Sequence, residues 1–236
     1  MADLDGRVIA IAGAAGGLGP TVARRLADDG ATIAATDVHQ ERLDQLADDL
    51  GLPDDRFDGR TVDLLSEDAT REWVSALTDR FGKVDGLAHL VGGWKGGDPI
   101  ATTPLEDYEW LHDLLVHTVQ HTTRAFYEQL ATSDHGRFVL VSSSQAQEPN
   151  GTNASYAATK AAAESWTLAL ADSLKDTNAT ANIIVVNAIL TPRMREESPE
   201  KKFPTFTSAE DLADSIAYVL SDSAAKMNGK RLELHP

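Results

Sequence analysis

The sequence predicts an α/β fold in which one doubly wound parallel sheet carries helices on both faces. Short β-branched or apolar runs alternate along the chain with longer stretches in which apolar residues recur at the helical period. A glycine-rich turn follows the first apolar run directly, and an aspartate closes the second run. This alternation is typical of parallel strands joined by crossover helices, so we expect the strands to share one sheet.

Seven strands are expected from the short apolar runs, and six helices from the stretches between them. In chain order the strands are Val8 to Ala12, Thr32 to Thr36, Thr61 to Leu64, Gly86 to Val91, Phe138 to Ser142, Asn182 to Asn187 and Leu232 to Leu234. The helices are Leu18 to Asp28, Gln40 to Leu50, Ser66 to Phe81, Leu105 to Ala131, Ser155 to Lys175 and Ser208 to Ser221. We expect a single domain over residues 1–236, in which residues 191–207 form a loop over the sheet edge.

Charge and cysteine content limit the kinds of molecule that the protein can bind and the chemistry that it can use. The 236 residues carry 21 Lys and Arg against 37 Asp and Glu, and the resulting charge of -16 disfavours nucleic acids and anionic bilayers. The acidity fits either a high-salt environment or simply a well-solvated surface. No cysteine is present, which excludes disulfides, thiolate nucleophiles and cysteine-ligated metals. The acidic N-terminus predicts no signal peptide and the longest uncharged run is too short and glycine-rich to span a membrane, so the cytoplasm is the default location.

A nucleotide site is predicted where the first strand meets the following helix. The glycines of this turn allow close approach of a pyrophosphate, whose charge the N–H groups of a helix N-terminus stabilise; the residues concerned are Gly13, Gly16, Gly17, Leu18 and Gly19. This is the turn of a Rossmann fold, although glycines also serve tight packing alone. Asp37, at the end of the second strand, can accept both ribose hydroxyls of an adenosine and would repel a 2′-phosphate, which favours NAD over NADP. A second, compatible role for Asp37 is to cap the next helix.

Three residues form a candidate proton-transfer group. Tyr156 and Lys160 are four apart on a predicted helix and therefore share a face. An ammonium beside a phenol favours the phenolate, so we expect a lowered pKa for Tyr156 and a role as general acid or base. Ser143 follows the fifth predicted strand, at the sheet edge where open α/β sheets bind ligands.

With these residues the chain resembles the short-chain dehydrogenase/reductase family over its whole length. The resemblance rests on the turn Gly13, Gly17 and Gly19, on Asp63-Leu64, on Val84-Asp85, and on Ser143, Tyr156 and Lys160. It implies that Asp63 and Leu64 contact the adenine and that Lys160 also binds the nicotinamide ribose. It further implies that Ser143 hydrogen-bonds the substrate carbonyl while Tyr156 transfers the proton. A preplaced hydroxyl pair would stabilise the negative charge that develops on the carbonyl oxygen.

The chain departs from the family pattern at three places. His89-Leu90-Val91-Gly92 replaces the usual Asn-Asn-Ala-Gly, although Val91 and Gly92 can still line the cofactor through their backbones. His117 aligns with an asparagine implicated in proton relay, and either relays protons or is a buried histidine satisfied by a backbone carbonyl. His112 and His121 lie on the same helix, but no further ligands are identifiable, so we expect no metal.

The third departure is the missing Pro-Gly turn before Thr191, the residue that, by the resemblance, we expect to bind the nicotinamide carboxamide. The loop around Trp94 and the short lid at about 191–207 resemble those of dihydropteridine reductase, where Trp94 would be a flat wall for a bicyclic substrate. Alternatively, Trp94 fills a gap in a glycine-rich loop. The active-site serine, which that enzyme lacks, argues instead for carbonyl or alcohol chemistry. Candidate substrate contacts are Trp94, Ser143, Gln145 and Arg193.

We therefore expect an NAD(H)-dependent oxidoreductase that acts on a small carbonyl or secondary alcohol. The alternatives are a pterin reductase and a non-catalytic dinucleotide-binding sensor. The helix from Leu105 and the alanine-rich helix around Tyr156 resemble the pair through which family members associate, so a homodimer or homotetramer is expected.

Overall fold

The computed structural model describes residues 3–234 and contains one seven-stranded parallel sheet. The strand order is β3-β2-β1-β4-β5-β6-β9, with all registered pairs parallel. The strands are β1 Val8–Ala12, β2 Thr32–Asp37, β3 Phe57–Thr61, β4 Gly86–His89, β5 Arg137–Ser143, β6 Thr180–Val186 and β9 Arg231–Glu233. The predicted fold class is confirmed, and the sequence placed six of the seven strands to within a few residues.

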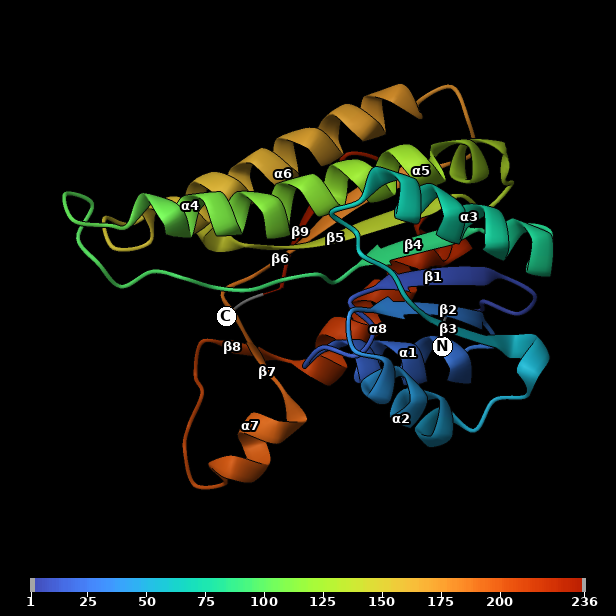
Figure 1. Cartoon of the computed structure of the whole chain (residues 1–236), viewed down its shortest axis with the longest axis horizontal. Coiled ribbons are helices and arrows are strands. Elements are labelled where there is room, and N and C mark those ends of the chain that lie inside the picture. Colours follow the sequence, from blue (N-terminus) through green and yellow to red (C-terminus); the bar gives the residue numbers. More distant parts are fainter. Residues whose placement is uncertain (1–2, 235–236) are drawn as a thin grey trace.

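Helices cover both faces of this sheet. Figure 1 shows α1, α2 and α8 on one side and α3, α4, α5 and α6 on the other. Their bounds are α1 Gly19–Asp28, α2 Gln40–Leu50, α3 Glu67–Phe81, α4 Leu105–His112, α5 Thr118–Thr132, α6 Ala154–Ser173 and α8 Ala209–Leu220. Short 3₁₀ turns occur at Asp54–Arg56, Ser144–Ala146 and Asp222–Ala224. In the part of the chain that the structure describes, no helix is both long enough and apolar enough to cross a bilayer.

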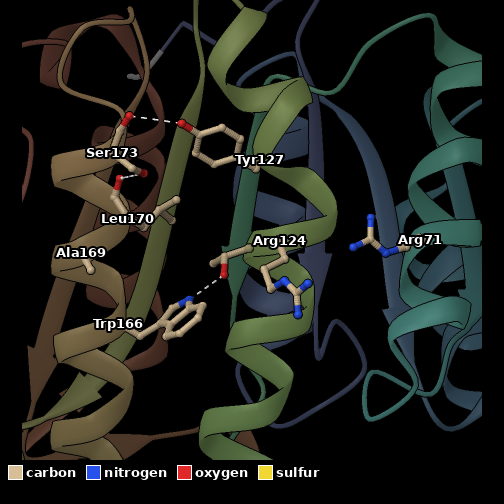
Figure 2. A pocket seen from close by; sticks show the side chains of 8 residues that line it. Arg71, Arg124, Tyr127, Trp166, Ala169, Leu170 and Ser173 are labelled. Atoms are coloured by element: carbon tan, nitrogen blue, oxygen red, sulfur yellow. Dashed lines mark hydrogen bonds between the residues drawn. The ribbon is translucent and has the colours of Figure 1, made fainter.

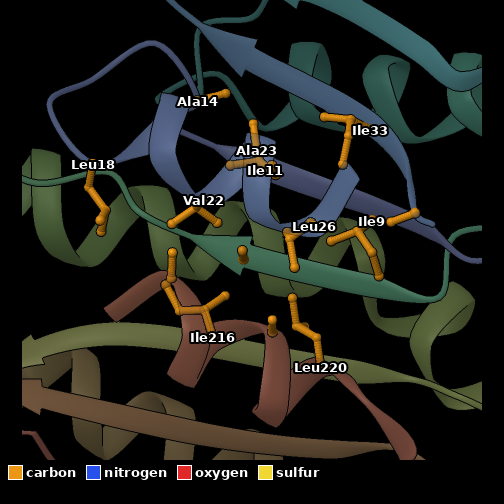
Figure 3. Packing of buried hydrophobic residues seen from close by; sticks show 14 of the residues in the cluster. Ile9, Ile11, Ala14, Leu18, Val22, Ala23, Leu26, Ile33, Ile216 and Leu220 are labelled. Carbon is orange, nitrogen blue, oxygen red and sulfur yellow. The ribbon is translucent and has the colours of Figure 1, made fainter. Parts of the chain in front are cut away.

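The central strands are apolar on both faces because both faces are covered. Ile9 and Ile11 of β1 pack into the cluster beneath α1 and α8, whereas Val8, Ala10 and Ala12 pack beneath the opposite helices. Figure 3 shows the first of these clusters. Successive side chains of a strand point to opposite faces, so one short run of sequence contributes to two cores.

The third strand was predicted at Thr61 to Leu64, but β3 is Phe57–Thr61. Four of its five residues are Asp, Gly, Arg and Thr, so it contains no apolar run from which a strand would be predicted. Asp58 is nevertheless buried, because its two carboxylate oxygens accept hydrogen bonds from Arg60 and Arg80. Two paired arginines thus let an aspartate occupy the edge strand, and Val62 to Leu64 follow the strand.

Two further segments differ from expectation. The helix predicted from Leu105 to Ala131 is interrupted, because Asp113–His117 forms a π-helical turn between α4 and α5. The predicted loop at 191–207 contains the helix α7, Pro192–Glu197, and is bracketed by a separate two-stranded sheet. Its strands are β7 Ala188–Leu190 and β8 Phe206–Ser208, which pair in parallel.

We predict that Leu26→Ala lowers the free energy of unfolding by about 2 to 5 kcal/mol, because it opens a cavity in a packed core. Leu26 is fully buried among β1, α1 and α8, as Figure 3 shows. Urea unfolding followed by circular dichroism measures the change. The matched control is Leu105→Ala, since Leu105 is 74% exposed and its truncation should cost about 0.5 kcal/mol or less. Equal losses for the two variants would contradict the packing described here.

Candidate active site

The cleft lies where the strand order reverses, between β1 and β4. Crossovers leave this point in opposite directions, so a crevice forms at the carboxyl ends of the strands. Two adjoining cavities of about 350 and 730 Å³ occupy it. They share the residues Gly17, Leu18, Leu90, Val91 and Gly92. Together they form one continuous cleft across the sheet edge.

The glycine turn forms the floor of this cleft. Gly13 has a φ of 82°, and a Cβ there would lie 2.9 Å from the backbone nitrogen of Val91. A Cβ on Gly19 would collide with the carbonyl oxygen of Ala14. The N-cap residue of α1 is Leu18, whose apolar side chain makes no hydrogen bond to the first N–H groups of the helix. The backbone N–H groups at this helix start are therefore suited to an anion such as a pyrophosphate.

The smaller cavity is suited to an adenosine. Asp37 lines it, and its Oδ1 and Oδ2 accept hydrogen bonds from the backbone nitrogens of Val38 at 2.8 Å and Ala15 at 3.1 Å. These two bonds hold the carboxylate at the end of β2. The predicted role of Asp37 as a helix cap is wrong, because His39 occupies the N-cap position of α2. Asp63 and Leu64, for which the family resemblance predicts adenine contacts, line the same cavity.

Two cationic or titratable side chains at this end were not predicted. His39 and Arg42 line the adenosine cavity together with Asp37. Both lie within five residues of Asp37, at the start of α2. Their closeness to Asp37 in the sequence could therefore have predicted that they line the same cavity. Arg42 thus brings a positive charge to the cavity that the Asp37 carboxylate also lines.

The larger cavity brings together the three predicted proton-transfer residues. Ser143 ends β5, whereas Tyr156 and Lys160 are one turn apart on α6, and all three line the cavity. The Lys160 Nζ donates a hydrogen bond to the carbonyl oxygen of Val141 at 3.0 Å and lies 5.9 Å from the centroid of the Tyr156 ring. The strand β5 and the next long helix, α6, thus present two hydroxyls and an ammonium to one space.

The electrostatics of this group differ from the expectation. Burial raises the pKa of Tyr156, and the hydrogen bond with Ser143 opposes that rise only in part. The predicted lowering by Lys160 is therefore wrong for this structure, because desolvation of the phenol dominates. Burial also lowers the pKa of Lys160 to about 8, against the opposing charge of Glu164.

Glu164 is a buried partner of this group that the sequence reasoning missed. It is 1% exposed, and its Oε2 accepts hydrogen bonds from Arg231 at 2.6 Å and Gln147 at 3.2 Å. Its Oε1 has no hydrogen-bond partner among residues 3–234. Glu164 follows Lys160 by four residues, so the helical spacing could have revealed it. Its charge acts on the ammonium and raises the pKa of Lys160.

Comparison with known proteins identifies the family of this chain. The family model described as short chain dehydrogenase matches residues 7–202. The chain belongs to the short-chain dehydrogenase family. The 3-oxoacyl-(acyl-carrier-protein) reductase FabG of Thermotoga maritima is 28% identical over 96% of this chain and 95% of its own length. This short-chain dehydrogenase is thus an oxidoreductase by its family.

Two solved structures illustrate the range of cofactors. NAD+-bound xylitol dehydrogenase is similar with a TM-score of 0.85 at 23% identity, and the match covers 98% of both chains. A blue fluorescent protein from a metagenomic library, in complex with NADPH, is similar with a TM-score of 0.84 at 26% identity, covering 98% of this chain and 97% of that chain. The two carry different nicotinamide dinucleotides, so family membership leaves the choice between NAD and NADP open.

This short-chain dehydrogenase has a histidine where the family pattern has its first asparagine. His89 is 1% exposed, and its ring nitrogens lie 3.3 Å from Thr118 Oγ1 and 3.2 Å from Thr122 Oγ1. Burial lowers the pKa of His89 to about 3, and the charge of Lys160 acts in the same direction. The ring is therefore neutral at physiological pH and joins β4 to α5 through two threonine hydroxyls.

His117 is not brought to the cleft. Its side chain is 41% exposed and its Nδ1 lies 3.0 Å from an oxygen of Asp113. Its neighbours Leu114, in the same π-helical turn, and Thr118, at the start of α5, line the smaller cavity instead. The alternative of a buried histidine bonded to a backbone carbonyl is also wrong for His117, whereas His121 does bond the carbonyl of Leu64 at 2.9 Å.

The candidate substrate contacts divide into two groups. Trp94 and Gln145 line the larger cavity together with Ser143, and Trp94 is 57% exposed. Arg193, on α7, lines neither half of the cleft, and its guanidinium is paired with Glu197 at the surface. Thr191 lines the larger cavity and also caps α7, because its Oγ1 accepts a hydrogen bond from the backbone nitrogen of Met194 at 3.3 Å.

A separate groove of about 430 Å³ lies along α5 and α6, with Arg71 of α3 at its rim, and shares no lining residue with the cleft (Figure 2). Trp166 donates a hydrogen bond to Thr123 at 2.9 Å, and Tyr127 donates one to the carbonyl of Ser173 at 3.2 Å. Both aromatic side chains remain more than a third exposed. The groove therefore presents apolar surface to solvent on the outer side of the helical layer.

We predict that Glu164→Gln lowers the pKa of Lys160 below about 8, because it removes the negative charge that opposes desolvation. The substitution keeps an oxygen for Arg231 and so preserves the packing. Titration of carbon-13-labelled lysine by NMR measures the pKa. The matched control is Glu72→Gln, an exposed glutamate on α3. An unchanged or higher pKa in Glu164→Gln would contradict the assignment.

Proposed function

We propose that this protein is an NAD(H)-dependent oxidoreductase that transfers a hydride between nicotinamide and a small carbonyl or secondary alcohol. The observation that carries the proposal is the convergence of Ser143, Tyr156 and Lys160 on one cavity that continues into the glycine-floored cleft. Positioned hydroxyls are useful for this reaction because negative charge develops on the substrate oxygen.

The residues present fit a dinucleotide. The glycine turn Gly13 to Gly19 would hold the pyrophosphate, and Asp37 would hold the adenosine ribose. Further contacts are proposed for Asp63, Leu64, Val91, Gly92, Thr191, Tyr156 and Lys160, all of which line the cleft. When bound, the nicotinamide would supply or accept the hydride.

Side chains of the protein would transfer the proton to or from the substrate oxygen. In the direction of reduction, Ser143 donates a hydrogen bond to the substrate oxygen, and Tyr156 donates its hydroxyl proton to that oxygen. The raised pKa of Tyr156 suits this role, since the phenol stays protonated near neutrality. Below about pH 8 the Lys160 ammonium is charged and stabilises the phenolate that remains. In the direction of oxidation the same phenolate accepts the proton.

Two alternatives remain as outcomes of the tests. A pterin reductase would use Trp94, which lines the larger cavity, as a flat wall for a bicyclic ring. A dinucleotide sensor would bind NADH without turnover. The conjunction of three proton-transfer residues in one cavity favours the carbonyl or alcohol reaction over both.

We also propose self-association as a homodimer or homotetramer in the cytoplasm. The exposed Trp166 and Tyr127 beside the α5–α6 groove support association through this helical layer. The net charge of -16 argues against nucleic-acid and membrane partners and leaves a small-molecule substrate.

We predict that Tyr156→Phe lowers kcat for NADH-dependent carbonyl reduction by about 100- to 10,000-fold, because the proton donor is lost. NADH binding should persist. The measurement is NADH consumption over a panel of ketones, aldehydes, quinones and quinonoid dihydropterin, with NADPH in parallel. The control variant is Tyr127→Phe, because this tyrosine lies on the α5–α6 groove and should leave turnover unchanged.

The outcomes of this panel separate the alternatives. Turnover of a carbonyl that collapses in Tyr156→Phe supports the proposal, whereas preference for the dihydropterin selects the pterin reductase. NADH binding with no turnover of any member would favour the sensor. Turnover that survives the loss of the Tyr156 hydroxyl would show that another group transfers the proton.

A second prediction concerns the cofactor. Asp37→Ser should lower kcat/KM for NADH by roughly 10- to 100-fold, because hydrogen bonds to a charged acceptor contribute about 1.5 to 3 kcal/mol. The same change should improve use of NADPH, since Arg42 then lies in the cavity without the competing carboxylate. Steady-state kinetics with both cofactors measure the switch. Asp44→Ser, on the same helix as Arg42 but outside the cleft residues, is the control. A wild type that prefers NADPH would refute the role of Asp37.

A further inference from the structure

The π-helical turn between α4 and α5 gathers three metal-binding side chains. His112, Asp113 and His117 each offer one donor atom, and these atoms lie within 4.8 Å of one another. The Nδ1 of His117 is 3.0 Å from an oxygen of Asp113, and the ring centroids of the two histidines are 4.5 Å apart. The spacing along the chain did not reveal Asp113 as the partner of this histidine pair.

The irregular turn is the cause of this cluster. In a regular α-helix, residues five apart point about 140° away from each other around the axis. The turn Asp113–His117 is instead π-helical, so it contains an extra residue and hydrogen bonds run five residues along. His112 and His117 therefore come to the same side, where Asp113 joins them. Such local π turns occur frequently at functional sites.

The surroundings favour a cation. The side chains of Asp113 and His117 are 55% and 41% exposed, so an ion can reach them from solvent. Glu109 lies one helical turn before Asp113, and the whole chain is strongly acidic. His121 stacks on His117 with nearly parallel rings, 6.0 Å between centroids, and its Nδ1 is engaged by the carbonyl of Leu64. His121 thus supports the orientation of His117.

We propose that His112, Asp113 and His117 bind one divalent transition-metal ion of the zinc class. Two imidazole nitrogens and one carboxylate oxygen suit Zn²⁺, Co²⁺ or Ni²⁺, with water in the remaining position. The hard ions Mg²⁺ and Ca²⁺ prefer oxygen ligands and do not compete well at such a site.

The site is distinct from the chemistry of hydride transfer. None of its three ligands lines the cleft, whereas Leu114 of the turn and Thr118, the first residue of α5, do. Thr118 is also the residue whose hydroxyl lies 3.3 Å from the Nε2 of the buried His89. A bound ion would bridge the two ends of the π turn and so stabilise the segment that presents these two side chains to the adenosine cavity.

The test is titration of the full chain with ZnCl₂ by isothermal calorimetry, in a buffer with excess MgCl₂ that occupies the general acidic surface. We expect one saturable Zn²⁺ site per chain. His112→Asn, Asp113→Asn and His117→Asn should each weaken Zn²⁺ affinity by about 10-fold or more, at least as much as changes to outer-shell partners of metal sites. Circular dichroism confirms that each variant is folded.

A second histidine–aspartate pair provides the matched control. His135 and Asp222 have the same 3.0 Å separation and side-chain exposures of 42% and 56%, but arginines also contact Asp222. His135→Asn should leave the Zn²⁺ affinity unchanged. Equal weakening by His135→Asn, unchanged affinity in the three ligand variants, or the absence of a saturable site would each overturn the proposal. Thermal unfolding gives an independent readout, since Zn²⁺ should raise the Tm of the wild type more than that of the ligand variants.

Discussion

The reversal of strand order between β1 and β4 is the constraint on which the rest of the structure depends. It opens a crevice at the carboxyl ends of the strands, and every strand that borders it delivers residues to the same edge. The glycine turn after β1, Asp37 after β2 and Ser143 at the end of β5 meet there although they are remote in sequence. Without the crossover pattern these residues would not share one cleft, because parallel strands reach a common edge only through their connections.

Burial determines how the groups in this cleft behave. It raises the pKa of Tyr156, lowers that of Lys160 to about 8, and keeps His89 neutral with a pKa of about 3. Glu164 opposes the effect on Lys160 through its buried negative charge. The phenol is thus a proton donor near neutrality, with an ammonium nearby whose charge depends on a second buried group. The protonation of the site is a property of the packing between β5 and α6 rather than of any single residue.

One irregular turn, between α4 and α5, contributes residues both to the cleft and to the histidine–aspartate cluster. Leu114 of the π turn and the adjoining Thr118 line the smaller cavity of the cleft, while the donor atoms of His112, Asp113 and His117 gather away from it. A metal ion bound by His112, Asp113 and His117 would therefore lie only one residue along the backbone from side chains that line the cleft. This short link is the physical reason to connect a metal at the turn with the order of the cofactor site.

The sequence by itself determined the alternation of strands and helices, the glycine turn, Asp37, and the Ser143, Tyr156 and Lys160 group, because each depends on local spacing or on position at a strand end. It misplaced β3, since the polar strand Phe57–Thr61 becomes tolerable only when two arginines reach Asp58. Only the tertiary structure decided the raised pKa of Tyr156, the exclusion of His117 from the cleft and the burial of Glu164. These depend on burial and on an extra residue within one helical turn, which spacing along the chain does not encode.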